Sequence, residues 1–596
     1  MVEFSVWAPM PQRVRLDVDG ALHPMTRHED GWWRVEVDCA PTARYGFVLD
    51  DDPTVLPDPR SARQPDGVHQ RSQLWDARRA TWTDAGWAGR PVEGAVIYEL
   101  HTGTFTPQGT FDSAIDKLDY LVELGVDIVE LMPVNAFNGT HGWGYDGVLW
   151  FAVHEPYGGP DALVRLIDAC HARGLGVLID AVFNHFGPSG NYLPRFGPYL
   201  SQVSNPWGQG LNLSGPGADE VRRYIVDCAL RWMRDFHADG LRLDAVHALV
   251  DTTAIHILEE LSAETDALSA VVGRPLSLIA ESDLNDPRLI TPRDRGGFGM
   301  TAQWDDDIHH AIHTAVSGER QGYYADFGSM AALANTLRNG YFHAGTYSSF
   351  RGRRHGRPLD TTLIPATRLL AYTCTHDQVG NRAAGDRPAH SLDTGQLAIK
   401  AALVLGSPYT AMLFMGEEWG STRPFQFFSS HPEPELARAT AEGRKAEFAE
   451  HGWDADSVPD PQDPATFQRS KLDWAQAGEP GRLQEVAITW RPATFRPHCD
   501  PGLGAGGLQQ VVEAELTQRI EHQTQAVTVQ AVRRSSQCRR RGYLGQPCPP
   551  GLLAGRGDHA APVRQALVAA FALQPHFGAL ARDRHHRGHA QFGSFL

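Results

Sequence analysis

The sequence predicts an α/β protein in which a small N-terminal β-sandwich precedes a (β/α)8 TIM barrel. Three observations favour this architecture. Short alternating segments fill the first 92 residues, compact apolar segments then alternate with helical patterns, and carboxylates follow several apolar segments. The alternation continues over roughly 300 residues, which favours a closed barrel over an open parallel sheet. No glycine-rich phosphate-binding motif follows the first barrel strand.

Residues 1–92 are expected to form the β-sandwich. Segments such as Phe4–Trp7 and Trp33–Val37 alternate in polarity, and turn formers such as Asp19–Gly20 separate them. The aromatic side chains of this region could bind sugar, but we expect them to pack in the core. The proline-rich run Leu56–Pro59 predicts a linker that crosses the surface.

Residues 93–480 are expected to form the barrel. The predicted strands are Val96–Leu100, Val126–Leu131, Gly176–Asp180, Gly240–Asp244, Leu276–Glu281, Leu369–Thr373 and Thr410–Phe414. The predicted helices cover residues 114–124, 162–172, 219–237 and 255–261. In a barrel of this kind, functional residues gather at the carboxyl-terminal ends of the strands.

The polar residues of Gly240–His247 are the first candidates for a site. Arg242 and Asp244 are two residues apart on a strand, so their side chains point to the same face. Because an unpaired buried charge is costly, each needs a partner or a function. A neighbouring arginine favours the ionised form of a carboxyl group, which a carboxylate nucleophile requires. Taken alone, a structural ion pair is the alternative.

Carboxylates also follow three other predicted strands. They are Asp180, Glu281, and Asp377 in the pair His376–Asp377. Glycoside hydrolysis uses two carboxyl groups, one ionised and one protonated. Glu281 ends an apolar run, where partial burial would raise its pKa and suit a general acid. Asp377 and His376 could hold sugar hydroxyls. Together with Asp244, these residues predict a glycoside hydrolase.

Four segments resemble the short motifs of the α-amylase superfamily, glycoside hydrolase family 13, and occur in that family's order. They are Asp180–His185, Gly240–His247, Ala280–Asp283 and Thr375–Asp377. The resemblance implies that Asp244 is the nucleophile, Glu281 the general acid/base and Asp377 the transition-state stabiliser. It also implies retention of configuration through a glycosyl-enzyme intermediate, with the two working carboxyl groups about 5 Å apart.

A wider set of residues is expected to bind substrate. The resemblance implies that Tyr145 stacks beneath the sugar and that histidines and Arg242 line its site. The full set is Tyr145, His185, Arg242, His247, Asp306, Asp307, His309, His310, His376, Gln378 and Asn381. The loop Tyr347–Arg351 is expected to lie on the substrate side.

No metal ion and no cofactor are expected. By composition, the acids and histidines of Asp306–His310 could bind a metal, but they do not form an i, i+4 zinc pair. Substrate contact or surface solvation is favoured for them. Asn184 resembles a calcium ligand of many α-amylases, but no further oxygen ligands can be identified. We therefore expect Asn184 to support His185.

Longer stretches resemble one subfamily, whose members hydrolyse the α-1,4 bond next to a terminal trehalose unit. They lie within residues 1 to about 475 and include Tyr98–Thr106, Trp143–Val148, Gln303–His310, His376–Arg382, Phe414–Gly420, Phe425–Phe428 and His431–Glu435. The resemblance implies maltooligosyl trehalose, an α-glucan oligosaccharide, as substrate and trehalose as product. A glycogen branching enzyme, which transfers the glycosyl group to a sugar 6-hydroxyl, is the alternative. A non-catalytic glucan-binding barrel is disfavoured because all three acids are present.

Composition limits the partners and the compartment. The net charge of −17 argues against nucleic acid or an anionic membrane surface as a partner. No stretch approaches the roughly 20 apolar residues of a membrane span, and Met1–Trp7 does not begin like a secretory signal. The seven cysteines are scattered without CxxC pairs. A cytoplasmic protein with reduced thiols is therefore expected.

Residues 481–596 depart from the family pattern, which predicts a C-terminal β-domain there. After Arg482 the chain has 13 arginines, seven acids and no lysine, and it lacks β-alternation. A basic tail that binds an acidic partner is one explanation. Our hypothesis is instead a shift of reading frame near residue 482, because a GC-rich gene read out of frame yields Arg, Gly, Pro, Ala and His without Lys.

Overall fold

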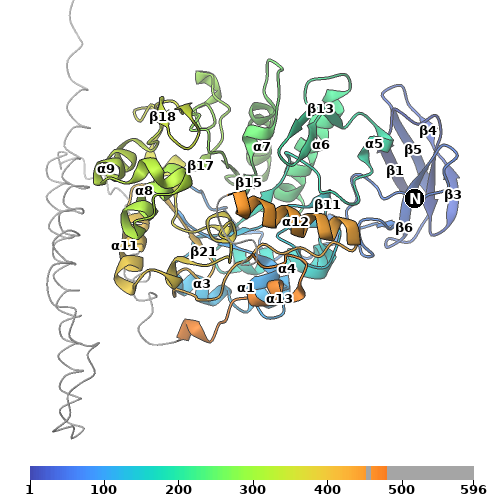
Figure 1. Cartoon of the computed structure of the whole chain (residues 1–596). Helices are drawn as coiled ribbons and strands as arrows, with labels where there is room; N and C mark the ends of the chain where they lie inside the picture. The colour runs from blue at the N-terminus through green and yellow to red at the C-terminus, as the bar shows by residue number, and fades with distance from the viewer. Residues whose placement is uncertain (451–457, 479–596) are drawn as a thin grey trace, which may run out of the picture. The chain divides into compact units, whose positions relative to one another are not determined.

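A computed structural model describes residues 1–450 and 458–478 of the chain, and both parts of the predicted architecture are present in it (Figure 1). The anomalous tail, residues 481–596, lies outside the described residues. Among the residues that are described, none of the helices combines the length and the apolar character needed to cross a membrane.

Two antiparallel sheets form the N-terminal part. One sheet has the order β1 (Val2–Trp7), β5 (Trp32–Val37), β4 (Thr26–Arg27). The other has the order β3 (Ala21–Pro24), β2 (Val14–Val18), β6 (Arg44–Leu49), β7 (Ser72–Gln73). Phe4 and Tyr45 meet between the sheets with ring centroids 5.0 Å apart. Trp7 and Trp33 are each 5% exposed, which confirms core packing of these aromatic residues.

The turn between β2 and β3 follows from its two residues. Asp19 and Gly20 both have positive φ, 49° and 90°. Two residues in this conformation make the tight turn that matches the twist of a hairpin, and Asp–Gly is a preferred pair for it. The predicted turn is therefore confirmed.

The prediction of a surface linker at Leu56–Pro59 is wrong, because all four residues are buried. Leu56 exchanges two backbone hydrogen bonds of 2.8 Å with Phe47. The Tyr45 hydroxyl donates to Asp58 at 2.7 Å. Proline-rich sequence indicates extended backbone, and such backbone can pair at a sheet edge as well as cross a surface.

Eight parallel strands close into a barrel, as predicted. They are β8 (Val96–Leu100), β9 (Ile128–Leu131), β12 (Gly176–Ala181), β15 (Gly240–Leu243), β16 (Ser277–Ala280), β17 (Ala302–Trp304), β20 (Leu369–Ala371) and β21 (Thr410–Phe414). β21 pairs with β8 and closes the ring. β17 was not among the predicted strands, because it has only three residues and a polar centre, Gln303, in place of an apolar run.

Helices follow most barrel strands and pack outside them (Figure 1). They include α2 (Phe111–Ile115), α3 (Leu118–Leu124), α4 (Gly159–Ala172), α6 (Ala218–Arg234), α7 (Ile257–Val272), α8 (Asp306–Ser317), α9 (Met330–Asn339) and α11 (Thr394–Leu405). The single helix predicted at 114–124 is two helices, and the one predicted at 255–261 extends to Val272. Gly125 ends α3 with a φ of 92°, a conformation that glycine adopts without strain.

Further short elements surround the barrel. Three hairpins are β10 (Asn135–Phe137) with β11 (Gly147–Val153), β13 (Leu200–Asn205) with β14 (Gly208–Leu211), and β18 (Thr346–Ser348) with β19 (Arg353–His355). The helices are α1 (Thr102–Phe105), α5 (Leu193–Phe196), α10 (His376–Gly380), α12 (Pro434–Glu450) and α13 (Pro464–Arg469).

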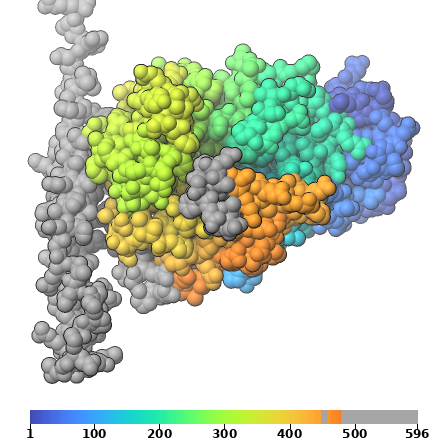
Figure 2. Space-filling view, viewed as in Figure 1, coloured from blue at the N-terminus to red at the C-terminus, as the bar shows by residue number. Residues whose placement is uncertain are grey.

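The N-terminal sheets pack directly on the barrel region, and Figure 2 shows one continuous surface from blue to green. Arg60 forms an ion pair with Asp227 of α6 at 2.6 Å. Trp7 packs edge-on against Tyr199, with centroids 5.2 Å apart.

Candidate active site

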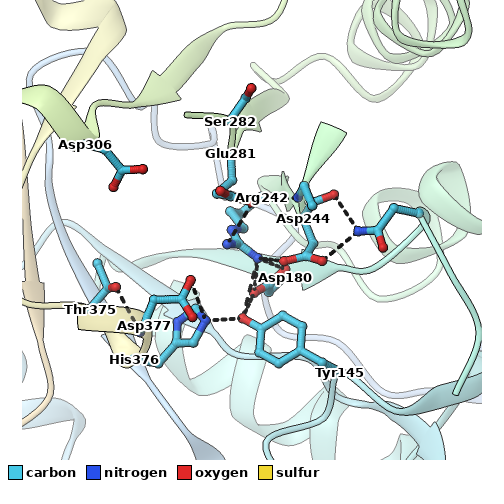
Figure 3. Close-up of polar contacts among 12 residues, drawn as sticks. Tyr145, Asp180, Arg242, Asp244, Glu281, Ser282, Asp306, Thr375, His376 and Asp377 are labelled. Carbon is cyan, nitrogen blue, oxygen red and sulfur yellow. Dashed lines mark hydrogen bonds and ion pairs between the residues drawn. The ribbon is translucent and has the colours of Figure 1, made fainter. Parts of the chain in front are cut away.

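Arg242 is the centre of the candidate site. It lies on β15, is fully buried, and donates from Nη1 to both oxygens of Asp180 at 2.8 and 2.9 Å and to Asp244 Oδ1 at 2.7 Å. Glu281 Oε2 lies 3.6 Å from Nη2. Figure 3 shows Arg242 between Asp244 and Glu281. One guanidinium group therefore contacts three carboxyl groups from three neighbouring strands, as the sequence spacing predicts for Asp244.

Both carboxylate oxygens of Asp244 are held in place. Asn184 donates from Nδ2 to Oδ2 at 2.7 Å, opposite the contact of Arg242 with Oδ1. The side chain of Asp244 remains 13% exposed. The next residue, Ala245, has a φ of 39°, which is strained for a residue with a Cβ. This turn directs the Ala245 N–H to Glu281 Oε2 at 2.6 Å and so links the two acids.

Glu281 follows β16 and has the environment of a general acid. Burial raises the pKa of its carboxyl group to about 8, and the negative charges of Asp244 and Asp377 add to this rise while Arg242 opposes it. At neutral pH the group therefore carries a proton that it can donate. The direction of this pKa shift agrees with the sequence-based expectation.

The third acid, Asp377, lies on α10 and is the most exposed of the three, at 41%. Its Oδ1 accepts a hydrogen bond from Asn381 Nδ2 at 3.1 Å. The preceding residue, His376, contacts Tyr145 through Nε2 at 2.8 Å, and Figure 3 shows this contact beside Asp377. The rings of Tyr145 and His376 stack, with centroids 5.1 Å apart. Tyr145 also donates to Asp180 at 2.6 Å. It therefore links His376 of α10 to Asp180, which accepts hydrogen bonds from Arg242.

Asp306 is also brought toward the acids (Figure 3). The Tyr372 hydroxyl donates to its Oδ1 at 2.7 Å, and Gln378 Nε2 does so at 3.4 Å. Burial raises the pKa of Asp306 to about 7 despite the hydrogen bond from Tyr372. Two of the expected substrate-binding residues, Asp306 and Gln378, thus lie together at this side of the site.

His185 and His247 lie on the other side, near the β13–β14 hairpin. Trp207 of this hairpin stacks on His185 at 5.8 Å and lies 6.5 Å from His247. Asn184 contacts His185 Nδ1, in line with the supporting role expected for it. Trp207, which is 49% exposed, was not among the residues expected at the site. The sequence feature that could have pointed to this tryptophan is its position in a polar, turn-rich segment.

Asp307, His309 and His310, which are also expected to bind substrate, are largely buried and contact other groups of the protein. Their exposed fractions are 6%, 1% and 9%. Asp307 accepts from the backbone N–H groups of residues 342 and 343, both at 2.9 Å. His309 contacts the Tyr324 hydroxyl at 3.1 Å, and His310 stacks on a neighbouring tyrosine. Residue types alone did not reveal that the folded chain covers these side chains.

Within residues 1–450 and 458–478, no cluster of three or more His, Cys, Asp or Glu side chains could hold a metal ion. The loop Tyr347–Arg351 is partly exposed, and its Arg351 pairs with Asp283, two residues beyond Glu281.

A closed (β/α)8 barrel with acids at neighbouring strand ends around one arginine defines a glycoside hydrolase of the alpha-amylase class.

Comparisons with known proteins agree with this class and narrow it. The model of the alpha amylase catalytic domain matches residues 69–197. Malto-oligosyltrehalose trehalohydrolase from Mycobacterium tuberculosis is 77% identical over 481 residues, 80% of this chain and 83% of the relative. The enzyme of that name from Arthrobacter ramosus is 62% identical over 79% of this chain and 83% of its own length.

A crystal structure of a Salmonella typhimurium protein described as an alpha amylase superposes with a TM-score of 0.76. It is 42% identical in sequence and covers 82% of each chain. The chain belongs to the malto-oligosyltrehalose trehalohydrolase family, within the alpha-amylase glycoside hydrolases.

Proposed function

We propose that the chain hydrolyses the α-1,4-glucosidic bond next to the terminal trehalose unit of maltooligosyl trehalose. The products are trehalose, which gives the chain a role in trehalose biosynthesis, and a shortened maltooligosaccharide. The observation that carries this proposal is the 77% identity to a named trehalohydrolase, combined with Asp244 and Glu281 held at Arg242 and with Asp377 beside His376 on α10.

The proposed reaction is a double displacement. Asp244 attacks the anomeric carbon while Glu281 gives its proton to the leaving oxygen of the trehalose unit. Glu281 then takes a proton from water, whose oxygen attacks the same carbon and displaces Asp244. Asp377 stabilises positive charge on the sugar ring in both transition states. The proposed retention of configuration follows from two inversions at one carbon.

Product analysis tests the substrate and the acceptor. With maltooligosyl trehalose as substrate, we expect free trehalose, and proton NMR at early times should show the new reducing end as the α-anomer. Amylose incubated under the same conditions should gain no α-1,6 branches. Branch formation without trehalose would instead assign the chain to the branching enzymes, which are the alternative.

The pH dependence of the reaction tests the role of Glu281. Its proton is needed for the first step and its pKa is about 8, so kcat/KM should fall above pH 8 by about tenfold per pH unit. The measurement is kcat/KM between pH 6 and 10, with thermal unfolding recorded over the same range to exclude loss of folded protein. A kcat/KM that stays level to pH 10 would contradict the assignment of Glu281 as the acid.

We further propose three regions, 1–92, 93–480 and 481–596, and a cytoplasmic location. The four described cysteines, Cys39, Cys170, Cys228 and Cys374, are free, which supports a reducing compartment. The out-of-frame hypothesis for the third region is tested by resequencing its coding region; a confirmed reading frame would refute it.

A further inference from the structure

The hydrogen bonds around His376 determine which of its ring nitrogens carry protons. Nδ1 faces Glu99 Oε1, and a carboxylate can only accept, so Nδ1 must donate. Nε2 lies 2.8 Å from the Tyr145 hydroxyl oxygen and 3.5 Å from Asp377 Oδ2. The Tyr145 hydroxyl donates its hydrogen to Asp180 Oδ2 at 2.6 Å, so its oxygen accepts from His376. Both ring nitrogens are therefore donors, which only the imidazolium form allows.

Glu99 holds this ring through both of its carboxylate oxygens. Oε1 accepts from Nδ1 of His376, and Oε2 accepts from the backbone N–H of the same residue at 3.1 Å. Glu99 lies on β8 and is only 1% exposed, so its side chain cannot reach a bound sugar. Both side-chain hydrogen bonds of Glu99 go to His376, so the direct contact of Glu99 with the site is through this ring.

Glu130 is the neighbour of Glu99 on the adjacent strand. The two residues are paired in the register of β8 and β9, and both are 1% exposed. Neither oxygen of Glu130 has a hydrogen-bond partner among the described residues. Burial, with the negative charges of Glu99 and Asp180, raises its pKa well above the usual range. Of this carboxyl pair, Glu99 alone has side-chain hydrogen-bond partners among the described residues, and both of its bonds go to His376.

We propose that Glu99 is a positioning residue that keeps His376 doubly protonated beneath the sugar site. The charged ring then donates to Tyr145, lies against Asp377 and offsets the negative charge of the neighbouring acids. The effect on the reaction rests on the proposed function, whereas the charge state of the ring does not.

The charges around His376 support this state. Burial lowers the pKa of the ring, but Asp377 and Glu99 overcome it and raise the pKa to about 9. The groups that face the ring from all sides are Glu99, Glu130, His101, Tyr145, Asp180, Arg242 and Asp377. Arg242 is the cationic member, because burial lowers the pKa of His101 to about 3, and it is outnumbered by Glu99, Asp180 and Asp377.

The first test measures the ring directly. In protein labelled with 15N-histidine, the His376 signals are assigned by their loss in His376→Gln. In the wild-type chain at pH 7.5 we expect both nitrogens to be protonated. In Glu99→Gln the ring of His376 should lose its proton at lower pH. Its proton dissociation constant should rise about tenfold or more. Glu130→Gln is the matched control and should change this constant less than about twofold.

The second test connects the ring to turnover. The ratio of wild-type to Glu99→Gln kcat/KM should grow about twofold or more between pH 6 and 8, as the variant loses its ring charge. The same ratio for Glu130→Gln should stay level. A neutral ring in the wild-type chain at pH 7.5 would overturn the proposal, even if Glu99→Gln failed to fold. A loss in Glu99→Gln that is equal at pH 6 and 8 would overturn it too. Absence of trehalose with a charged ring would refute only the proposed function.

Discussion

Replacement of Asp244 by Ala is expected to lower kcat for trehalose release by about 10⁴-fold or more. The proposed covalent intermediate forms on Asp244, and the described residues hold no other carboxylate fixed between Arg242 and Asn184. Turnover is measured by trehalose formation from maltooligosyl trehalose under single-turnover and steady-state conditions. Near-UV circular dichroism should show that the variant keeps the fold.

Rescue by a small anion distinguishes loss of the nucleophile from general damage. In Asp244→Gly, azide can enter the space left by the side chain and attack the anomeric carbon from the same face. The expected product is a glycosyl azide of β configuration, because only one inversion takes place. Turnover of Asp244→Ala at the wild-type rate would contradict the proposed role of Asp244.

Replacement of Arg242 by Leu is expected to lower the free energy of unfolding by about 3–5 kcal/mol and to abolish turnover. The guanidinium group is fully buried, and its removal leaves Asp180, which is 2% exposed, without its cationic partner. The change in the free energy of unfolding is measured by urea unfolding, with tryptophan fluorescence as the signal. The matched control is Arg165→Leu, which breaks an ion pair with Asp112 at a side chain 55% exposed and should cost about 1 kcal/mol or less.

The loss of stability in Arg242→Leu should also depend on pH. In the wild-type chain, burial raises the pKa of Asp180 to about 6 and Arg242 opposes this rise, so the variant raises it further. A carboxyl group with a raised folded-state pKa binds its proton more tightly when folded, so stability falls as pH rises through that pKa. The variant should therefore lose more stability at pH 8 than at pH 5. A loss that is the same at both values would contradict burial of an unpaired charge.

Much of the fold followed from local pattern. The strands Val96–Leu100 and Thr410–Phe414 have the bounds that their apolar runs predict. β17 was missed, because three residues around a buried glutamine carry no such pattern. Local sequence also does not show which residues the folded chain covers, such as Asp307 and His309, which are 6% and 1% exposed.

By itself, the sequence determined the fold class and the candidate acids, because strand periodicity places Arg242 with Asp244 and the strand ends carry the carboxyl groups. Only the tertiary structure decided how these groups act on one another. Burial sets the pKa of Glu281, and barrel closure brings Glu99 to His376, which lies 277 positions away in the chain. The physical reason is that solvent exposure and strand register are properties of the closed barrel, whereas residue spacing is a property of each strand alone.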